Sequence, residues 1–479
     1  MRRLICAVRL SLTLALLAPA AGAVAAAAPV ASAATPRSPA AYERLARDIF
    51  AELVGINTTH ALGSARAAEA LAARFRNAGF PDADLYVGGP RPDKMNLVVR
   101  LHGRGRAQPV LFNAHLDVVE ARPADWSVDP FRLTEQGGYF YGRGTVDVKN
   151  EVAALSADLI RLRAEGYRPD RDIILAFGTD EEAGGDANGV EWLLQQRRAL
   201  VDAALVINTD ATNAVSLNGE RQLMTIQTAE KVYATYTLTT HSSGGHSSRP
   251  PRNNAVYRLG RALDRLGAYQ FPVRLSATTR RYLAATARRV GGARAAAIEG
   301  ALANPPDPKA LDELRDAPLL NAQLHTTCQA TLVEGGQSES ALPLRARATI
   351  QCRLLPEEDP VWVLDTLKRV VDDPAVEVET LVPPEPSPPT ELDAALLAKV
   401  ERITQEMWPG MPVVPIMYPG ASDNLYFRRA GLTTFGISGT FKDQADDRAH
   451  GTDERIGVTA FYESLEFSYR LMKALAGGR

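Results

Sequence analysis

The chain carries almost no surplus of either charge. Its 479 residues include 54 Lys and Arg against 56 Asp and Glu, which gives a formal net charge of -2 at pH 7 and an isoelectric point near 6.4. Because there is no basic excess to compensate many phosphates, nucleic-acid binding is disfavoured as the main role. A small-molecule substrate fits better. With 46% hydrophobic and 23% charged residues, the composition is that of a globular protein long enough for two or three domains.

Long apolar runs are also missing after residue 34, since no later segment reaches the roughly 18 apolar residues that a membrane span needs. At the start of the chain, three arginines flank an apolar run at residues 10–17, and small residues follow up to Ala33. This pattern predicts a signal peptide over residues 1–34, cleaved near Ala33 or Ala34, and a periplasmic or secreted protein. A membrane anchor is the alternative, but Pro19 and Gly22 interrupt the apolar stretch.

Cysteine is scarce as well. Of three cysteines, Cys6 leaves with the predicted leader, and Cys328 and Cys352 remain. In an oxidising compartment this pair would either form a disulfide or stay as two buried thiols, and the sequence leaves both open. Neither lies among the motifs described below, so neither is assigned to catalysis or to a metal.

Short apolar runs alternate with helical patterns in the first half of the chain. The runs are β-branched or rich in Leu, and helical stretches such as residues 151–165 and 189–200 separate them. They cover residues 95–101, 110–119, 172–178 and 204–208. This alternation predicts an α/β domain in which helices surround a mostly parallel sheet.

The pattern changes after Asp210. Residues 222–240 alternate like a half-exposed strand or hairpin, an Arg- and Ala-rich helical insertion covers 278–302, and the Pro-rich residues 383–389 are typical of a linker. We therefore expect a discontinuous catalytic domain interrupted by a smaller inserted α+β domain. The expected parts are residues 35–221 and 386–479 for the catalytic domain and 222–385 for the inserted one.

Acidic residues and histidines recur where the predicted strands end. His115 and Asp117 lie two apart near the end of a strand, so both point to one face, where the carboxylate can orient the imidazole. Asp147 follows a turn with two glycines and begins a helix, where a carboxylate can bridge two cations. By itself, Asp147 also fits an ordinary helix N-cap.

The next strand runs into the sequence Thr-Asp-Glu-Glu-Ala-Gly-Gly at residues 179–185. Adjacent carboxylates repel each other and cost stability unless a cation or proton is shared, although a solvated loop would explain them too. As a site, Glu182 would bind metal and Glu181 would act as the general base. Asp210 ends a further strand at the same sheet edge, which is where open α/β sheets place their sites.

His450 lies far away in the sequence and would be an ordinary surface residue if taken alone. Together with the residues above it completes a mixed set of imidazoles and carboxylates that suits two zinc-like ions. The set comprises His115, Asp147, Glu182, Asp210 and His450.

In their order and residue sequence these motifs resemble those of the M20 metallopeptidases, over nearly all the chain after residue 34. The lengthened insertion resembles that of the branch with carboxypeptidase S and the N-acyl amino acid hydrolases. The resemblance implies two divalent ions, Zn²⁺ with Mn²⁺ or Co²⁺ as alternatives, bridged by Asp147. His115 and Asp210 would complete one site, and Glu182 and His450 the other.

The resemblance also implies substrate contacts. His246 would polarise the scissile carbonyl, in many relatives from the second subunit of a homodimer formed through the inserted domain. Arg353 would pair with a substrate carboxylate, and Gly420 belongs to a further matching motif at residues 420–423. One departure is Ser340, which stands where the family usually has Asn, so recognition at this position would be weaker or altered.

The expected activity is that of a secreted metal-dependent exopeptidase, of carboxypeptidase or dipeptidase type, that cuts an amide bond next to a residue with a free carboxylate. An N-acyl amino acid hydrolase is the alternative, because Arg353 suits both substrate classes. A non-catalytic peptide-binding protein is more distant, since neither a ligand nor the base is missing. The expected partners are small peptides or N-acyl amino acids, with no nucleic acid and no membrane.

Overall fold

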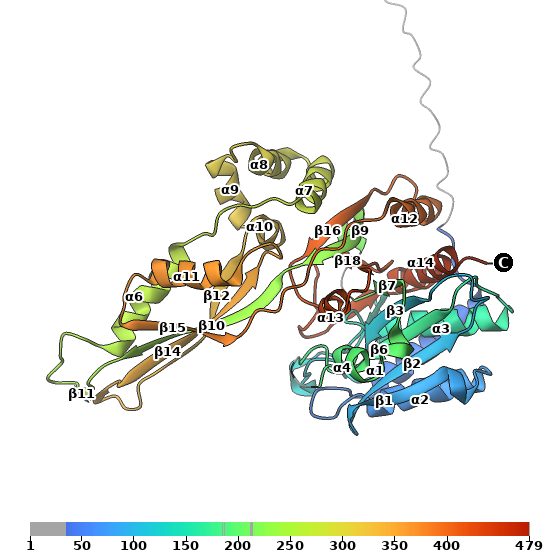
Figure 1. Ribbon diagram of the computed structural model, residues 1–479, viewed down its shortest axis with the longest axis horizontal. Helices are drawn as coiled ribbons and strands as arrows, with labels where there is room; N and C mark the ends of the chain where they lie inside the picture. Colours follow the sequence, from blue (N-terminus) through green and yellow to red (C-terminus); the bar gives the residue numbers. More distant parts are fainter. Residues whose placement is uncertain (1–34, 184, 186, 211–213, 479) are drawn as a thin grey trace, which may run out of the picture. The chain divides into compact units, whose positions relative to one another are not determined.

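The described chain forms two main sheets (Figure 1). The larger sheet has its central strands buried on both faces. The computed structural model describes residues 35–183, 185, 187–210 and 214–478, and within these residues the sheet has ten strands in the order β1-β2-β6-β3-β7-β17-β9-β8-β18, with β16 paired to β9. In chain order they are β1 (Leu85–Arg91), β2 (Lys94–Leu101), β3 (Val110–His115), β6 (Ile173–Gly178), β7 (Leu205–Asn208), β8 (Ala214–Leu217), β9 (Glu220–Glu230), β16 (Val413–Tyr418), β17 (Thr434–Gly436) and β18 (Phe441–Asp443).

Parallel pairing dominates the centre of this sheet. β3 pairs in parallel with β6 on one side and β7 on the other, β17 runs parallel to β7, and β16 runs parallel to β9. Antiparallel pairs of β2 with β1 and β6 form one edge. The predicted α/β fold with a mostly parallel sheet is therefore confirmed. β3 and β6 are buried at every position, which explains their unbroken apolar sequences.

Helices cover the two faces with separate apolar clusters. Leu97 and Val99 of β2 pack on one side, whereas Val98 packs on the other, because successive strand side chains point to opposite faces. The first face carries α1 (Ala40–Gly55), α2 (Ala65–Asn77), α3 (Lys149–Ala164), α12 (Ala394–Met407) and α14 (Val458–Ala476). The second face carries α4 (Gly189–Gln196), α5 (Arg198–Val201) and α13 (Asn424–Arg429). The sheet is thus the middle of three layers.

The smaller main sheet is antiparallel and has the order β12-β14-β10-β15. Its strands are β10 (Val232–His241), β12 (Thr327–Gly335), β14 (Arg345–Leu354) and β15 (Val376–Val382). Helices α6 (Ala255–Ala268) and α11 (Pro360–Val371) pack on one of its faces. The alternating burial along β14 follows from this one-sided cover.

Four further helices pack on the larger sheet, where they enclose Leu223 of β9 and Val414 of β16. They are α7 (Ala277–Val290), α8 (Gly292–Leu302), α9 (Pro308–Arg315) and α10 (Pro318–Leu324), and the first two correspond to the predicted Arg- and Ala-rich insertion. The remaining strands are short: β11 (Gly245–His246) pairs β13 (Ala341–Leu342), and β5 (Tyr139–Tyr141) pairs both β4 (Thr134–Gln136) and β19 (Arg455–Gly457).

The chain passes from the larger to the smaller sheet around Lys231. β9 pairs with β16 and β17 in the larger sheet, and its last eight residues are buried, whereas the sequence predicted a half-exposed strand here. The start that we propose for the inserted domain, at residue 222, therefore falls inside a strand of the larger sheet. The chain returns through residues 383–389 before α12.

Cys328 and Cys352 form a disulfide, which resolves the two alternatives that the sequence left open. They stand directly opposite each other on β12 and β14, so the register of this strand pair brings them together. The leader predicted over residues 1–34 lies outside the described residues. Among the described helices, none has the length and apolar character that crossing a membrane requires.

Candidate metal centre

Three neighbouring parallel strands end where the predicted site residues begin. His115 is the last residue of β3, the acidic turn at residues 179–182 follows β6, and Asp210 follows β7. β3 lies between β6 and β7, so the three carboxyl ends meet at one edge of the sheet, as the sequence predicts.

The five predicted ligands form two groups that share Asp147. One group holds His115, Asp147 and Asp210, the other Asp147, Glu182 and His450, and within each group the possible ligand atoms lie within 4.8 Å of one another. His115 Nε2 is 3.1 Å from Asp147 Oδ1, while His450 Nε2 is 3.2 Å from Asp147 Oδ2 and 2.9 Å from Glu182 Oε2. The two oxygens of one carboxylate thus face two different histidines, which is the arrangement that a bridging ligand needs.

Asp147 is held in place by Glu454, a fully buried residue four positions after His450. Glu454 Oε1 accepts hydrogen bonds from the backbone N–H groups of Val146 and Asp147, at 2.7 and 3.1 Å. Its other oxygen accepts from the backbone of Gly144 and the side chain of Arg143. No sequence pattern assigned a role to Glu454. Its carboxylate nevertheless fixes the glycine turn that carries Asp147.

Asp117 acts mainly on the acidic turn. Its carboxylate oxygens accept hydrogen bonds from the backbone N–H groups of Glu181 and Glu182, at 3.2 and 3.1 Å. His115 Nδ1 lies 3.0 Å from the backbone carbonyl oxygen of Asp117 and 3.7 Å from its carboxylate. The carbonyl is therefore the nearer partner of the ring, and it leaves Nε2 of His115 to face Asp147.

The electrostatics of the cluster favour cations. Burial, followed by the charge of Asp210, raises the pKa of Glu181 well above its usual range. Burial, followed by the charge of Asp147, raises the pKa of Glu182 to about 7, and hydrogen bonds to Asp147 and Glu182 raise the pKa of His450 to about 10. Without metal, crowded carboxylates thus share protons with the histidines. Two imidazoles and three carboxylates are also the nitrogen and oxygen donors that Zn²⁺ and similar divalent ions prefer, so the residues present fit such ions.

We expect metal affinity to increase steeply with pH. In the metal-free protein, His450 keeps its proton below a pKa of about 10 and Glu182 below about 7, so an incoming ion has to displace these protons. The affinity should rise about tenfold per pH unit for each displaced proton. Competition with a chelating dye between pH 6 and 9 measures this slope, and His450→Ala should reduce it above pH 7. A flat profile would contradict these protonation states.

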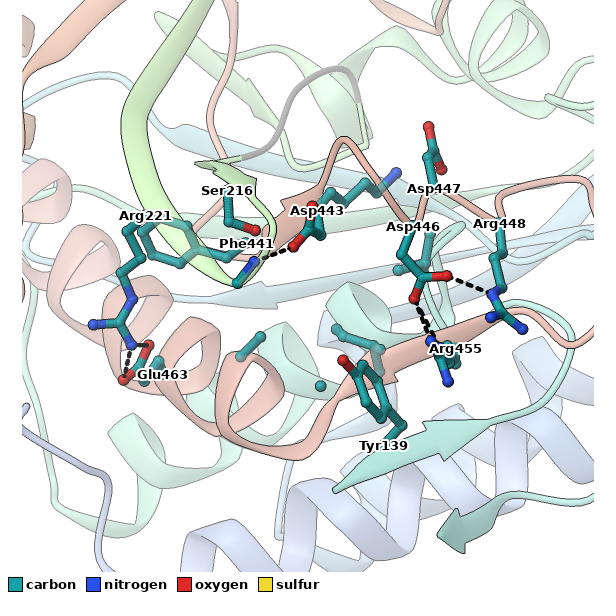
Figure 2. A pocket seen from close by; sticks show the side chains of 16 residues that line it. Tyr139, Ser216, Arg221, Phe441, Asp443, Asp446, Asp447, Arg448, Arg455 and Glu463 are labelled. Carbon is teal, nitrogen blue, oxygen red and sulfur yellow. Dashed lines mark hydrogen bonds and ion pairs between the residues drawn. The ribbon is translucent and has the colours of Figure 1, made fainter. Parts of the chain in front are cut away.

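The loop that carries His450 is shaped by charged pairs that line a pocket of about 200 Å³ (Figure 2). Asp446 accepts hydrogen bonds from Arg448 at 2.7 Å and from Arg455 at 2.6 Å, so one carboxylate ties both flanks of the loop, as Figure 2 shows. On another wall, Arg221 pairs with Glu463 at 2.6 Å. The Asp446 contacts tie down the residues on both sides of His450, whose φ of +62° lies in the left-handed region.

Arg353 lies on β14, close enough to the acidic turn for the charge of Glu181 to act on it. Its guanidinium stacks over the ring of Tyr233, with 4.7 Å to the ring centroid. Burial lowers the pKa of Arg353, and the charges of Tyr233, Tyr418 and Glu181 oppose this shift. The Nη1 of Arg353 is buried and has no hydrogen-bond partner among the described residues. An unpaired buried donor of this kind is suited to a carboxylate from a ligand.

Because Gly420 has no side chain, the ring of Tyr418 can lie directly against the backbone at residue 420. A Cβ at this position would lie 2.5 Å from the Tyr418 ring, so a larger residue would push the ring away. Burial, and then the charges of Asp210 and Asp147, raise the pKa of Tyr418 well above its usual range, which puts the phenol near the cluster. The sequence did not indicate Tyr418, and its place at the end of a parallel strand was the available signal.

Asp423 is a second neighbour of the cluster that received no role from the sequence. It is buried, and its Oδ1 accepts a hydrogen bond from Asn188 at 2.8 Å. Burial raises its pKa to about 7, and the charges of His115 and Asp117 act on it as well. Because Asp423 belongs to the motif at residues 420–423, that motif was the signal for it.

His246 and Ser340 lie together but away from the cluster. Both are exposed, and β11 and β13 bring them side by side, with the Ser247 N–H donating to the Ser340 carbonyl at 2.9 Å. His246 Nδ1 is 2.9 Å from Ser248 Oγ. Within the described residues, no contact joins either of them to the predicted ligands. The chain by itself therefore does not bring His246 to the site.

Comparison with known proteins agrees with this geometry. Residues 111–474 match the Peptidase family M20/M25/M40. The chain is 28% identical to the human N-fatty-acyl-amino acid synthase/hydrolase PM20D1 over 76% of its own length and 74% of the relative. It is 26% identical to the probable carboxypeptidase S-like 2 of Dictyostelium discoideum, over 83% and 78% of the two chains.

Among solved structures, the fold matches the M20 family metallo-carboxypeptidase Sso-CP2 from Sulfolobus solfataricus. The TM-score is 0.68 at 17% sequence identity, and the match covers 90% of this chain and 98% of that one. At this identity the likeness shows a shared fold.

Proposed function

This chain belongs to peptidase family M20/M25/M40 and is a metal-dependent hydrolase, and from that premise we propose that it cuts an amide bond next to a residue with a free carboxylate. The observation that carries the proposal is the pair of ligand groups sharing Asp147, with Glu181 beside them and outside both groups. Arg353, with its unpaired buried donor, supports the free carboxylate.

In this proposal the residues divide the work between binding and proton transfer. His115, Asp147 and Asp210 would hold one divalent ion, and Glu182 and His450 together with Asp147 would hold the second, with Zn²⁺ as the first candidate for both. Two such ions supply Lewis acidity and lower the pKa of water towards neutrality. Glu181 takes a proton from the attacking water and delivers it to the departing amine, so that the amide C–N bond breaks and an acid and an amine form.

Two further residues would contact the substrate. Arg353 would bind its carboxylate through charge-assisted hydrogen bonds and so place the amide bond at the cluster. His246 would donate a hydrogen bond to the oxyanion, from the partner subunit of a homodimer formed through the inserted domain. The exposed position of His246 supports this arrangement, because an exposed tip is accessible to a second copy.

For the substrate we propose a small peptide cut by a carboxypeptidase or dipeptidase reaction, with an N-acyl amino acid as the second candidate. The similarity to a carboxypeptidase S-like protein favours the first, and the similarity to an N-fatty-acyl-amino acid hydrolase favours the second. We also propose a periplasmic or secreted location. The pattern of residues 1–34 and the Cys328–Cys352 disulfide support it, since disulfides persist in oxidising compartments.

The test is release of free amino acids by purified protein lacking residues 1–34. The panel should hold dipeptides, longer peptides and N-acetyl and N-fatty-acyl amino acids, each as a free acid and as a C-terminal amide, with added Zn²⁺ or a chelator. Chelator-sensitive cleavage of the free acids is the expected result, and the preferred group distinguishes the two candidates. Cleavage that a chelator leaves unchanged would contradict the proposal.

We expect Arg353→Met to raise KM for free-acid substrates by about 10- to 100-fold, because a charge-assisted pair contributes about 1.5–3 kcal/mol. The ratio of kcat/KM between each free acid and its C-terminal amide measures the effect, and it should fall towards one. Arg353→Lys keeps the charge without the planar fork and serves as the matched control, with an intermediate ratio. An unchanged ratio in Arg353→Met would show that another residue binds the carboxylate.

A further inference from the structure

Asp180, in the acidic turn, has a left-handed backbone conformation. It precedes Glu181 and Glu182 directly, its φ is +57°, and its side chain is completely buried. The left-handed region costs energy for any residue with a Cβ, and residues persist there only when their surroundings hold them. The direction in which Glu181 and Glu182 leave the strand therefore depends on whatever fixes Asp180.

Lys94 and His60, from another part of the chain, hold one oxygen of this carboxylate, and the half-exposed Arg91 lies 4.0 Å from the other oxygen. Lys94 Nζ donates to Asp180 Oδ1 at 2.5 Å, and the Lys94 side chain is only 1% exposed. His60 Nδ1 lies 3.0 Å from the same oxygen, and Lys94 also donates to the His60 backbone carbonyl at 2.6 Å. We refer to Lys94, Asp180 and His60 as the turn clamp.

The neighbours of the turn clamp fix the other residues of the turn. Asn96, two residues after Lys94 on β2, accepts a hydrogen bond from the Thr179 N–H at 3.0 Å, and Ser64 Oγ donates to Thr179 Oγ1 at 2.6 Å. On the far side, Asp117 accepts the backbone N–H groups of Glu181 and Glu182. Each residue from 179 to 182 thus has its own partner, and Asp180 is the one whose conformation needs support.

We propose that Lys94 is a positioning residue, which, through Asp180, sets the geometry of Glu181 and Glu182. This inference rests on the function proposed above for those two glutamates. A buried ion pair elsewhere would stabilise the fold alone. This pair acts on the residue whose left-handed backbone delivers both the base and a metal ligand, so its loss should change catalysis and metal binding together.

Lys94→Met tests the inference, because it removes the nearest cation of the buried Asp180 carboxylate and leaves the half-exposed Arg91 at 4.0 Å from Oδ2. The turn should then leave the left-handed conformation to solvate the carboxylate. We expect kcat to fall by about 10- to 100-fold, since a displacement of about 1 Å costs that much, with KM little changed. Metal affinity should fall by about tenfold or more, as is typical when the support of a ligand is lost. Both are measured with the holoenzyme, by steady-state kinetics and chelator competition.

A rescue variant separates positioning from simple destabilisation. Glycine adopts a φ of +57° without strain and brings no carboxylate, so it does not need Lys94. Lys94→Met/Asp180→Gly should therefore recover a large part of kcat relative to Lys94→Met alone. The matched control is Arg161→Met, which breaks a buried pair with Glu466 between α3 and α14 and should lower Tm while kcat stays unchanged.

Two outcomes would overturn the inference: a Lys94→Met protein with lower Tm but wild-type kcat and metal affinity, or a double variant no more active than Lys94→Met. If the wild-type protein cleaves no amide substrate, the proposed function fails and metal affinity decides alone. A weaker affinity in Lys94→Met that is restored in the double variant then still supports the turn clamp, and an unchanged affinity overturns it.

Discussion

Replacing Glu181 by Gln should lower kcat for amide hydrolysis by about 10²- to 10⁴-fold, the usual contribution of a general base. The amide of Gln has nearly the same shape as the carboxylate but cannot accept the proton of the attacking water. Glu181 lies outside both groups of possible metal ligands, so the ions should stay bound. Its backbone N–H, which donates to Asp117, is untouched, so the turn should keep its geometry.

The measurement is kcat at saturating substrate together with the metal content of the same sample. Glu182→Gln is the matched neighbour, because it changes the same kind of side chain one residue away but alters one ligand group, so it should lose activity together with one of the two ions. Glu299→Gln, at an exposed position of α8, should leave both unchanged. A Glu181→Gln protein with two ions and wild-type kcat would remove Glu181 from the mechanism.

The sheet edge at the candidate metal centre was predictable because its residues follow strands with a clear sequence pattern. His115 and Asp210 end runs of buried apolar residues, and parallel neighbours place their ends at one edge whatever the loops do. The burial of β9 could not be predicted in the same way. This strand buries polar residues, among them Gln227 and Glu230, and Arg428 pairs with Glu230 at 3.0 Å. Burial that depends on a distant partner leaves no periodic signal.

The residues that support the site could not be predicted from the sequence for the same reason. Glu454 reaches Val146 across 308 positions of the chain, and Lys94 reaches Asp180 across 86. Neither residue is unusual in its own segment, because a lone Glu or Lys is most often a solvated surface residue. The disulfide could not be predicted, because it requires the register of β12 against β14 that places Cys328 opposite Cys352. The sequence pattern does not specify this register to within one residue.

Asp147→Asn should remove both ions at once and reduce hydrolysis to the background rate. Asp147 Oδ1 faces His115 and Oδ2 faces His450, so one substitution alters both ligand groups. Asn keeps the size of the side chain, but its nitrogen is a donor and cannot bind a cation, and its oxygen carries no charge. The Glu454 hydrogen bonds to this turn involve the backbone and should survive, so the protein should still fold.

Metal stoichiometry distinguishes this bridging role from a ligand to one ion. Asp210→Asn and Glu182→Gln each alter a single group, so each should leave one ion bound, whereas Asp147→Asn should leave none. Circular dichroism and Tm of the three metal-free variants control for folding. If Asp147→Asn retained one tightly bound ion, the two groups would be independent sites, and the coupling of both ions through one carboxylate would be wrong. Loss of both ions with an intact fold would show that the two sites form one centre.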